Sequence, residues 1–209
     1  NQKKMIPILI DVAQIMDNLF WMEAYGDKEA LLNSLAGDTA AQEFAKINYG
    51  PWDRLGDNAP FIAGVGEKPL GAEYYPLDMT VEEFEAWDDP TKTSLYTMIR
   101  RNEEGALVSI PFHEYFGEQI LEASDLLIQA AELAEDPGFK DYLLLRADAL
   151  LNDDYFESDL AWMEMKNNQI DFVVGPIENY EDKLFNYKAA HEAYVLIKDL
   201  AWSERLAKY

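Results

Sequence analysis

The feature that most constrains the fold is a helical repeat of apolar residues near the start of the chain. In residues 5–25, MIPILIDVAQIMDNLFWMEAY, apolar side chains recur at intervals of three and four residues, at Ile8, Val12, Ile15, Met16 and Leu19. In an α-helix this spacing places the side chains on one face. We therefore predict one long amphipathic helix over this segment, ended by Gly26 and Asp27.

Helical signals dominate the rest of the chain. Thr80 and Glu83 have the Thr-x-x-Glu spacing of a capping box, which predicts a helix to about Trp87. Pro111 suits the first turn of a helix that continues through EQILEASDLLIQAAELAE. Because only Asp-Pro-Gly separates that helix from the next, the two should pack as an antiparallel pair. Further helices are predicted over about 28–36, through Ala45 after a break at Gly37–Asp38, and over 139–151, Tyr155–Lys166 and Leu200–Tyr209.

Strand signals are fewer and shorter. Residues 94–110 alternate in polarity around a turn at Asn102–Gly105, which predicts a β-hairpin. The β-branched run Ile170–Val174 predicts a strand that ends at Gly175–Pro176, and residues 189–198 fit either a strand or a helix. Residues 46–78 are rich in Pro and Gly but also in aromatic residues, which indicates a long ordered loop.

These elements predict an α+β fold that is predominantly α-helical, with long amphipathic helices and a small β-hairpin or strand element. The chain has 209 residues, which is enough for one large domain or two small ones with a real core. We expect a single mainly helical domain over 1–209, with a possible subdivision into 1–110 and 111–209.

Composition excludes several classes of function. The formal net charge is −23, from 40 acidic and 17 basic side chains, and this charge repels the phosphates of nucleic acids. A solvated acidic surface explains most of this negative charge. The charge would also favour a cationic ligand such as the ammonium end of a peptide. The chain has no cysteine, which excludes disulfides and thiolate chemistry.

Targeting signals leave the compartment open. No stretch approaches the roughly 20 apolar residues of a membrane span, so no transmembrane segment is predicted. The chain begins Asn-Gln-Lys-Lys without Met, which indicates that an N-terminal piece has been removed. The composition fits an exported or periplasmic protein as well as a cytoplasmic one.

A possible zinc motif begins at His113, in the sequence His-Glu-Tyr-Phe-Gly-Glu. A catalytic zinc site needs about three protein ligands, and the chain has two histidines, His113 and His191. Glu118 is five positions after His113, roughly 140° around a helix, so the two do not share a face. We predict no metal site here, and we interpret His113 as a surface histidine in the first turn of a helix. Three acidic pairs are ordinary features of turns and helix starts: Asp88–Asp89, Glu103–Glu104 and Asp153–Asp154.

One segment resembles a known enzyme family. Residues 170–198, IDFVVGPIENYEDKLFNYKAAHEAYVLIK, are similar to the dipeptidyl peptidase III pattern Glu-Ser-Tyr-Ile-Gly-Phe-Ile-Glu-Ser-Tyr-Arg-Asp-Pro and the strand after it. The matching residues are Gly175, Ile177, Glu178, Tyr180 and Asp182. The segments NYGPWDRL, PLGAEYYPLDMT and RADALLNDDYFESDLAWM resemble relatives described as zinc-dependent or Nudix-type hydrolases, although no Nudix glutamate helix is present.

This resemblance implies a place within a larger, two-lobed metallopeptidase. The chain would be the N-terminal, non-zinc portion of an aminopeptidase-type hydrolase of peptides. The true His-Glu-x-x-Gly-His helix would lie beyond Tyr209, so zinc is expected in a downstream zinc lobe of the full-length parent and no cofactor in this chain. His113–Glu118 lies upstream of the family's motif, and we interpret its likeness to that motif as a coincidence.

The resemblance also implies a substrate-binding role for particular residues and no catalytic residue in this chain. Asp171 replaces the family glutamate that helps to hold the substrate's N-terminal ammonium, while Glu178 and Tyr180 are retained. Val173 replaces a tyrosine that supports the transition state. Losing such a hydroxyl can cost about 10²–10³ in rate where it touches the developing oxyanion.

Three readings of function follow. The first is a cleft-forming portion of a dipeptidyl peptidase III-like hydrolase, inactive alone. The second is an acidic helical binding or scaffold module without catalysis, which Val173 favours. The third, a metal enzyme that uses His113, Glu114 and Glu118, has the least support.

Overall fold

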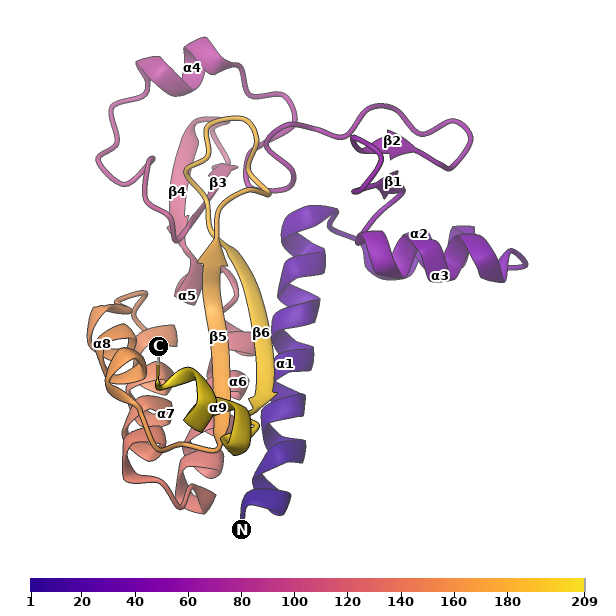
Figure 1. The fold of residues 1–209 in the computed structure, drawn as a ribbon. Coiled ribbons are helices and arrows are strands. Elements are labelled where there is room, and N and C mark those ends of the chain that lie inside the picture. Colours follow the sequence, from indigo (N-terminus) through magenta and orange to yellow (C-terminus); the bar gives the residue numbers. More distant parts are fainter. Residues whose placement is uncertain (209) are drawn as a thin grey trace. The chain divides into compact units, whose positions relative to one another are not determined.

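A computed structural model of the chain describes residues 1–208. The predicted α+β, mainly helical fold is confirmed: helices alternate with three two-stranded sheets (Figure 1). The helices are α1 (Gln2–Ala24), α2 (Lys28–Ser34), α3 (Thr39–Asn48), α4 (Val81–Ala86), α5 (Phe112–Tyr115), α6 (Gly117–Leu133), α7 (Pro137–Leu150), α8 (Phe156–Glu164) and α9 (Leu200–Leu206). The strands are β1 (Trp52–Asp53), β2 (Ala59–Pro60), β3 (Thr97–Arg101), β4 (Leu107–Pro111), β5 (Ile170–Glu178) and β6 (Ala190–Ile197). The helix predicted at the end of the chain is present as α9, and Tyr209 lies outside the described residues.

The chain forms two compact units, each assembled from separate segments. The first unit contains residues 1–17, 112–177 and those from 191 onward, and the second contains residues 18–111 and 178–190. The subdivision into 1–110 and 111–209 considered from the sequence stays a prediction, and these units do not follow it, because each draws on both parts of the chain. The chain also changes unit within α1 and near the paired ends of β5 and β6.

Helix α1 is amphipathic, as predicted. Its most buried apolar side chains, each at most 2% exposed, are Met5, Leu9, Val12, Met16, Leu19, Trp21 and Ala24, whereas Ile8 and Ile15 of the predicted face are only partly buried. By length and composition alone this helix could also cross a membrane, although no transmembrane segment was predicted. The core helix of a soluble protein and a signal sequence pass the same test, and 33% of the apolar 18-residue window of α1 is buried.

In the first unit, α6 and α7 pack against each other, as predicted. Asp136 caps α7 by accepting a hydrogen bond from the Phe139 amide at 2.9 Å. The predicted single helix after Pro111 is wrong in two details. Pro111 is the last residue of β4, and the helix is divided into α5 and α6 at Phe116, where the backbone leaves the helical region (φ −104°, ψ 24°).

Strands β5 and β6 run antiparallel to each other (Figure 1). The predicted end of the first strand at Gly175 is wrong, because β5 continues to Glu178. Gly175 has φ +121°, a conformation that glycine adopts readily and other residues rarely. The ambiguous stretch 189–198 is the strand β6.

In the second unit, side-chain caps begin the short helices. Asp27, Asp38 and Thr80 each accept a hydrogen bond from an amide three residues later. The predicted long loop is ordered: Tyr74 and Tyr75 are buried, and the Trp52 indole donates to the Gly66 carbonyl at 2.8 Å. This loop also contains β1 and β2.

The predicted hairpin is present as β3 and β4, with Met98 opposite Ile110. Arg101 at the end of β3 binds the Glu83 carboxylate of α4 in two places, at 2.8 Å each. Thr80 caps α4 as predicted, by accepting a hydrogen bond from the Glu83 amide. The Glu83 side chain, which a capping box would direct back to Thr80, binds Arg101 instead.

Candidate functional site

The candidate site is built on the first half of β5. Ile170, Phe172 and Val174 are at most 4% exposed, whereas Asp171 and Val173 between them are partly exposed. This alternation follows from the two-residue period of a strand. It anchors one face of β5 in the core and presents the Asp171 carboxylate on the other.

Trp162 of α8 fixes one oxygen of that carboxylate. Its indole Nε1 donates a hydrogen bond to Asp171 Oδ1 at 2.9 Å. Among residues 1–208 this is the one hydrogen bond that reaches the Asp171 side chain. A carboxylate can accept about four hydrogen bonds, so Asp171 keeps acceptor capacity for a ligand.

A buried arginine supports the helices beside this strand. Arg146 of α7 is 5% exposed and forms an ion pair with Asp159 of α8. Its guanidinium also lies over the rings of Tyr142 and Tyr155, at 5.4 and 5.2 Å from their centroids. The ion pair joins α7 to α8, the helix that carries Trp162.

Gly175 of β5 lies beside that arginine. A Cβ atom at position 175 would be 3.6 Å from Arg146 Nη1 and 3.5 Å from Tyr155 Cε1, an ordinary contact distance. The requirement for glycine therefore comes from the positive φ angle rather than from space.

Asp171 and Asp159 affect the pKa of the buried Tyr142 hydroxyl. Burial, and then the negative charges of Asp171 and Asp159, raise the pKa of Tyr142 to about 12, against an opposing effect of Arg146. The tyrosine hydroxyl therefore stays protonated at neutral pH.

The other sequence-predicted site residues lie elsewhere. Glu178 is at the far end of β5 from Asp171 and is exposed, and Tyr180, in the following loop, is 57% exposed. Val173 presents an aliphatic side chain on the same face as Asp171. The structure thus places Asp171 and Val173 together on one strand face, with Glu178 and Tyr180 farther along the chain.

His113 takes part in a pair that sequence reasoning missed. Its Nδ1 lies 2.8 Å from Asp153 Oδ2, and its backbone amide donates to the same oxygen at 3.2 Å. Burial raises the pKa of Asp153, with the hydrogen bonds from His113 acting in the opposite direction. No group of three or more His, Asp or Glu side chains suited to a metal ion occurs in residues 1–208.

The second unit holds two acidic side chains that are strongly bound. Asp182 is fully buried and accepts from the Tyr75 hydroxyl at 2.7 Å and from four backbone amides, those of Leu184, Phe185, Tyr187 and Lys188. The neighbouring Glu181 is 4% exposed and is paired with both Arg54 and Lys68.

Comparison with solved structures identifies a strong likeness. The chain superposes on the dipeptidyl peptidase III of Caldithrix abyssi with a TM-score of 0.92 and 45% sequence identity, over 99% of this chain and 41% of that one. For the dipeptidyl peptidase III of Corallococcus sp. strain EGB the TM-score is 0.91 and the identity 33%, over 99% of this chain and 40% of that one. The chain is similar to a portion of these dipeptidyl peptidases III. The resemblance stated from residues 170–198 is confirmed and extends to nearly the whole chain.

Sequence comparison adds a plant protein. Nudix hydrolase 3 of Arabidopsis thaliana is 27% identical over 94% of this chain and 33% of that protein. No protein-family model matches the chain. The chain spans about two fifths of the solved relatives and a third of the plant protein.

Some features of the site could have been found from the sequence and others could not. A tryptophan that precedes a strand by a few residues, as Trp162 precedes Asp171, is visible in AWMEMKNNQID. The ion pair between Arg54 and Glu181 joins residues 127 positions apart, and no local pattern indicates it.

Proposed function

We propose that this chain is the non-zinc, cleft-forming portion of a longer zinc-dependent hydrolase of peptides, similar to dipeptidyl peptidase III. The observation that carries the proposal is the geometry of Asp171. Its carboxylate stands on the outward face of a strand, held by one indole donor and with acceptor capacity to spare. The likeness to two dipeptidyl peptidases III supports the reaction class.

In this proposal Asp171 binds the N-terminal ammonium of a peptide. A carboxylate and an ammonium form a charge-assisted hydrogen bond, which is roughly twice as strong as a neutral one. Since Trp162 occupies Oδ1, the ammonium binds through the remaining acceptor positions. Trp162 thus positions the carboxylate and does not itself touch the ammonium.

Glu178 and Tyr180 are proposed as separate peptide contacts. They lie at and after the last residue of β5, in the second unit, whereas Asp171 lies near the start of β5, in the first. Substitution of Glu178 or Tyr180 should lower the affinity for a peptide, whereas Asp171 sets the preference for a free amine.

Zinc belongs to the rest of the longer polypeptide in this proposal. The side chains described here do not fit the ion, because residues 1–208 contain no suitable group of three ligands. This chain binds and orients the peptide, and its share of the chemistry ends there.

The test compares the 209-residue chain with the longer parent polypeptide. We expect zinc in the parent by elemental analysis, and hydrolysis of dipeptidyl arylamides that chelators block. Asp171→Ala in the parent should lower kcat/KM for free-amine substrates by roughly tenfold or more, since hydrogen bonds to charged groups contribute about 1.5–3 kcal/mol.

Asp141→Ala provides a matched control, because Asp141 is an exposed acid on α7. It should leave kcat/KM unchanged. Chelator-sensitive hydrolysis by the 209-residue chain alone, or equal effects of the two substitutions, would contradict the proposal.

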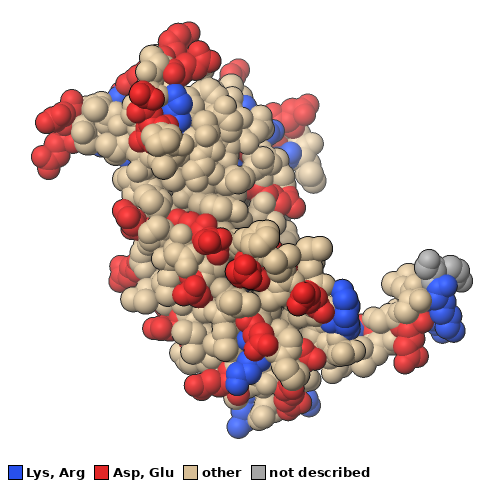
Figure 2. All heavy atoms as spheres, turned by 90° about the vertical axis from the view of Figure 1, so that its left-hand side faces the viewer, with Lys and Arg blue, Asp and Glu red and all other residues tan. Residues whose placement is uncertain are grey.

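One observation favours a second candidate, an acidic binding or scaffold module without catalysis. Val173 lacks the hydroxyl that the family pattern places there, and acidic side chains are scattered over the face in Figure 2, with fewer basic ones between them. This candidate expects a parent without zinc and without hydrolysis that still binds peptides with a free amine.

A further inference from the structure

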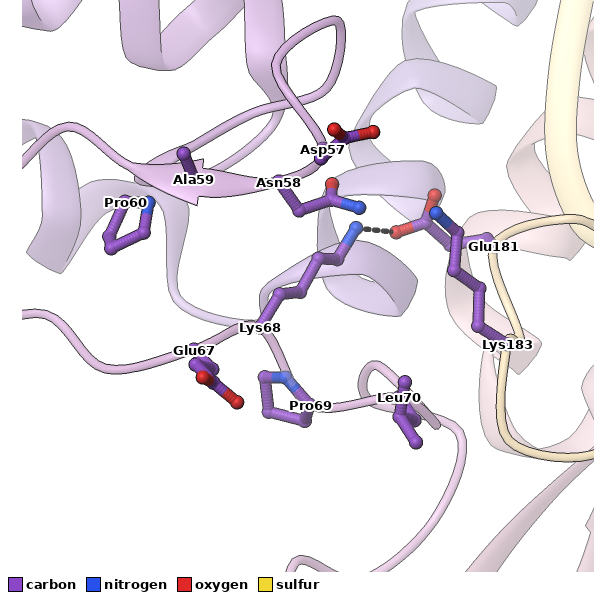
Figure 3. A pocket seen from close by; sticks show the side chains of 10 residues that line it. All are labelled: Asp57, Asn58, Ala59, Pro60, Glu67, Lys68, Pro69, Leu70, Glu181 and Lys183. Carbon is purple, nitrogen blue, oxygen red and sulfur yellow. Dashed lines mark hydrogen bonds and ion pairs between the residues drawn. The ribbon is translucent and has the colours of Figure 1, made fainter.

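A cavity of about 410 Å³ lies in the second unit, whereas Asp171 belongs to the first. Its walls come from the β1–β2 turn, from residues 67–70 and from the segment 181–183 (Figure 3). A backbone hydrogen bond of 2.8 Å from the Lys183 amide to the Leu70 carbonyl ties two of these walls together. The cavity is therefore formed by segments far apart in the sequence.

One carboxylate at the inner end of the cavity is paired with two cations. Glu181, whose side chain is 2% exposed, pairs with Lys68 of the lining and with Arg54 behind it. The Lys68 and Arg54 side chains are 11% and 23% exposed. These three side chains together have a formal charge of +1.

A third cation lies at the same cavity. Lys183 lines it and is exposed, and its positive charge acts on Lys68. The lining has three carboxylates. Glu181 pairs with Lys68, whereas Asp57 and Glu67 are exposed and point away from the Lys68 ammonium in Figure 3.

The pKa of Lys68 reflects its burial and the charges around it. Burial lowers the pKa of Lys68, and the positive charges of Arg54 and Lys183 lower it further, against the opposing effect of Glu181. A second anion beside Lys68 would offset both the burial of the ammonium and its repulsion from the other cations.

The remaining walls are apolar or neutral. Ala59, Pro60, Pro69 and Leu70 line the cavity, and the Asn58 amide faces the Lys68 ammonium end (Figure 3). Leu70 is 60% exposed, so an apolar ligand group could cover it. A cavity with a cationic end and apolar sides suits an anion attached to a small hydrocarbon group.

We propose that this cavity binds a carboxylate that carries a small apolar side chain, with Lys68 and Lys183 contacting the carboxylate and Pro60, Pro69 and Leu70 contacting the apolar group. The C-terminal residue of a peptide and a free small carboxylic acid share this chemistry. The site stands independently of the proposed role of Asp171, because the two lie in different units.

The experiment titrates the 209-residue chain with N-acetyl-L-leucine and, separately, with N-acetyl-L-leucinamide, followed by NMR chemical shifts. We expect saturable binding of the acid in the millimolar range and at least tenfold weaker binding of the amide, because hydrogen bonds to charged groups contribute roughly 1.5–3 kcal/mol. Equal binding of acid and amide, or no saturable binding of the acid, would overturn the site.

Substitutions locate the effect. Lys68→Met should weaken acid binding by about tenfold or more, and Lys183→Gln, at an exposed position, by roughly two- to fivefold. Lys46→Gln is the matched control, since Lys46 is an exposed lysine of the same unit outside the cavity. If Lys46→Gln weakens binding as much as Lys183→Gln, the binding reflects general charge and the proposal is wrong.

A leucine-terminated tetrapeptide separates the two sources of the carboxylate. Binding that is tighter than that of N-acetyl-L-leucine, and that is lost when the peptide's C-terminus is amidated, supports a peptide terminus. Equal affinity of the tetrapeptide and the small acid supports a free carboxylic acid. Tetrapeptide binding that survives amidation would contradict the proposal.

Discussion

Asp171 and Asp182 are held in opposite ways, although they are eleven residues apart in the sequence. Asp182 is fully buried and accepts five hydrogen bonds, from the Tyr75 hydroxyl and four backbone amides. Asp171 is partly exposed and accepts one, from Trp162. A carboxylate whose acceptor positions are all used organises the chain around it, whereas one with spare positions can bind a ligand.

The same contrast separates the two units. In the second unit, Glu181 and Asp182 connect loops that have little regular structure of their own. In the first unit, burial of apolar side chains stabilises the helices and β5. The Asp171 carboxylate is not needed for that packing and can accept hydrogen bonds from a ligand. We therefore expect substitution of Asp182 or Glu181 to affect mainly stability and substitution of Asp171 to affect mainly binding.

The largest expected effect is that of Asp182→Ala on stability. It removes the acceptor of five donors from a buried position, which should lower the free energy of unfolding by about 3–5 kcal/mol. Urea denaturation measures this change. Asp171→Ala is the matched comparison and should change stability by less than about 0.5 kcal/mol; equal losses in the two variants would break the contrast.

Glu181→Gln should have a smaller effect that depends on pH. Burial acts to raise the pKa of Glu181, but its bonds with Arg54 and its attraction to Lys68 prevail, so the pKa in the folded protein lies below the ordinary value. The ion pairs therefore stabilise the fold above the ordinary glutamate pKa, and this contribution is lost as the pH falls through the lowered value.

At neutral pH, Glu181→Gln should lower the free energy of unfolding by about 2–3 kcal/mol. Urea denaturation between neutral pH and pH 3 measures the pH dependence. The difference between the wild-type chain and the variant should shrink toward the acid end. A difference that stays constant with pH would show that the carboxylate charge is not what stabilises these loops.

Trp162→Phe should have the smallest effect, and on binding rather than stability. It removes the donor to Asp171 Oδ1 from a side chain that is 39% exposed, so we expect about a fivefold loss in affinity for free-amine peptides. Isothermal titration of the longer parent polypeptide measures this loss. Affinity for the N-acetylated peptide should stay unchanged. Trp202→Phe, at an exposed tryptophan of α9, is the control; a similar loss there would remove the positioning role from Trp162.

The sequence predicted the helices well because their signals are local. The apolar stripe of α1 and the cap at Thr80 are read from residues three or four positions apart. The caps at Asp38 and Asp136 were not predicted. The extent of β5 was missed because Gly175–Pro176 usually ends a strand, and here the glycine conformation lets the strand continue. The strand β6 was ambiguous, because its mixed composition has no clear period.

The site was predictable only in part. Asp171 was found through the resemblance of one short segment, and its partner Trp162 lies nine positions earlier in the same stretch. Lys68, Arg54 and Glu181 meet only because distant loops fold together, with separations of 113 and 127 residues. No pattern within a single segment carries that information.

The most direct test of the role of Asp171 is the preference for a free amine. The affinities of a peptide and of its N-acetylated form are measured for the parent polypeptide with and without Asp171→Asn, a substitution that keeps the shape and removes the charge. We expect the wild-type protein to bind the free amine at least tenfold more tightly and the variant to bind the two forms nearly equally. A preference that survives Asp171→Asn would contradict the assignment of the ammonium to Asp171.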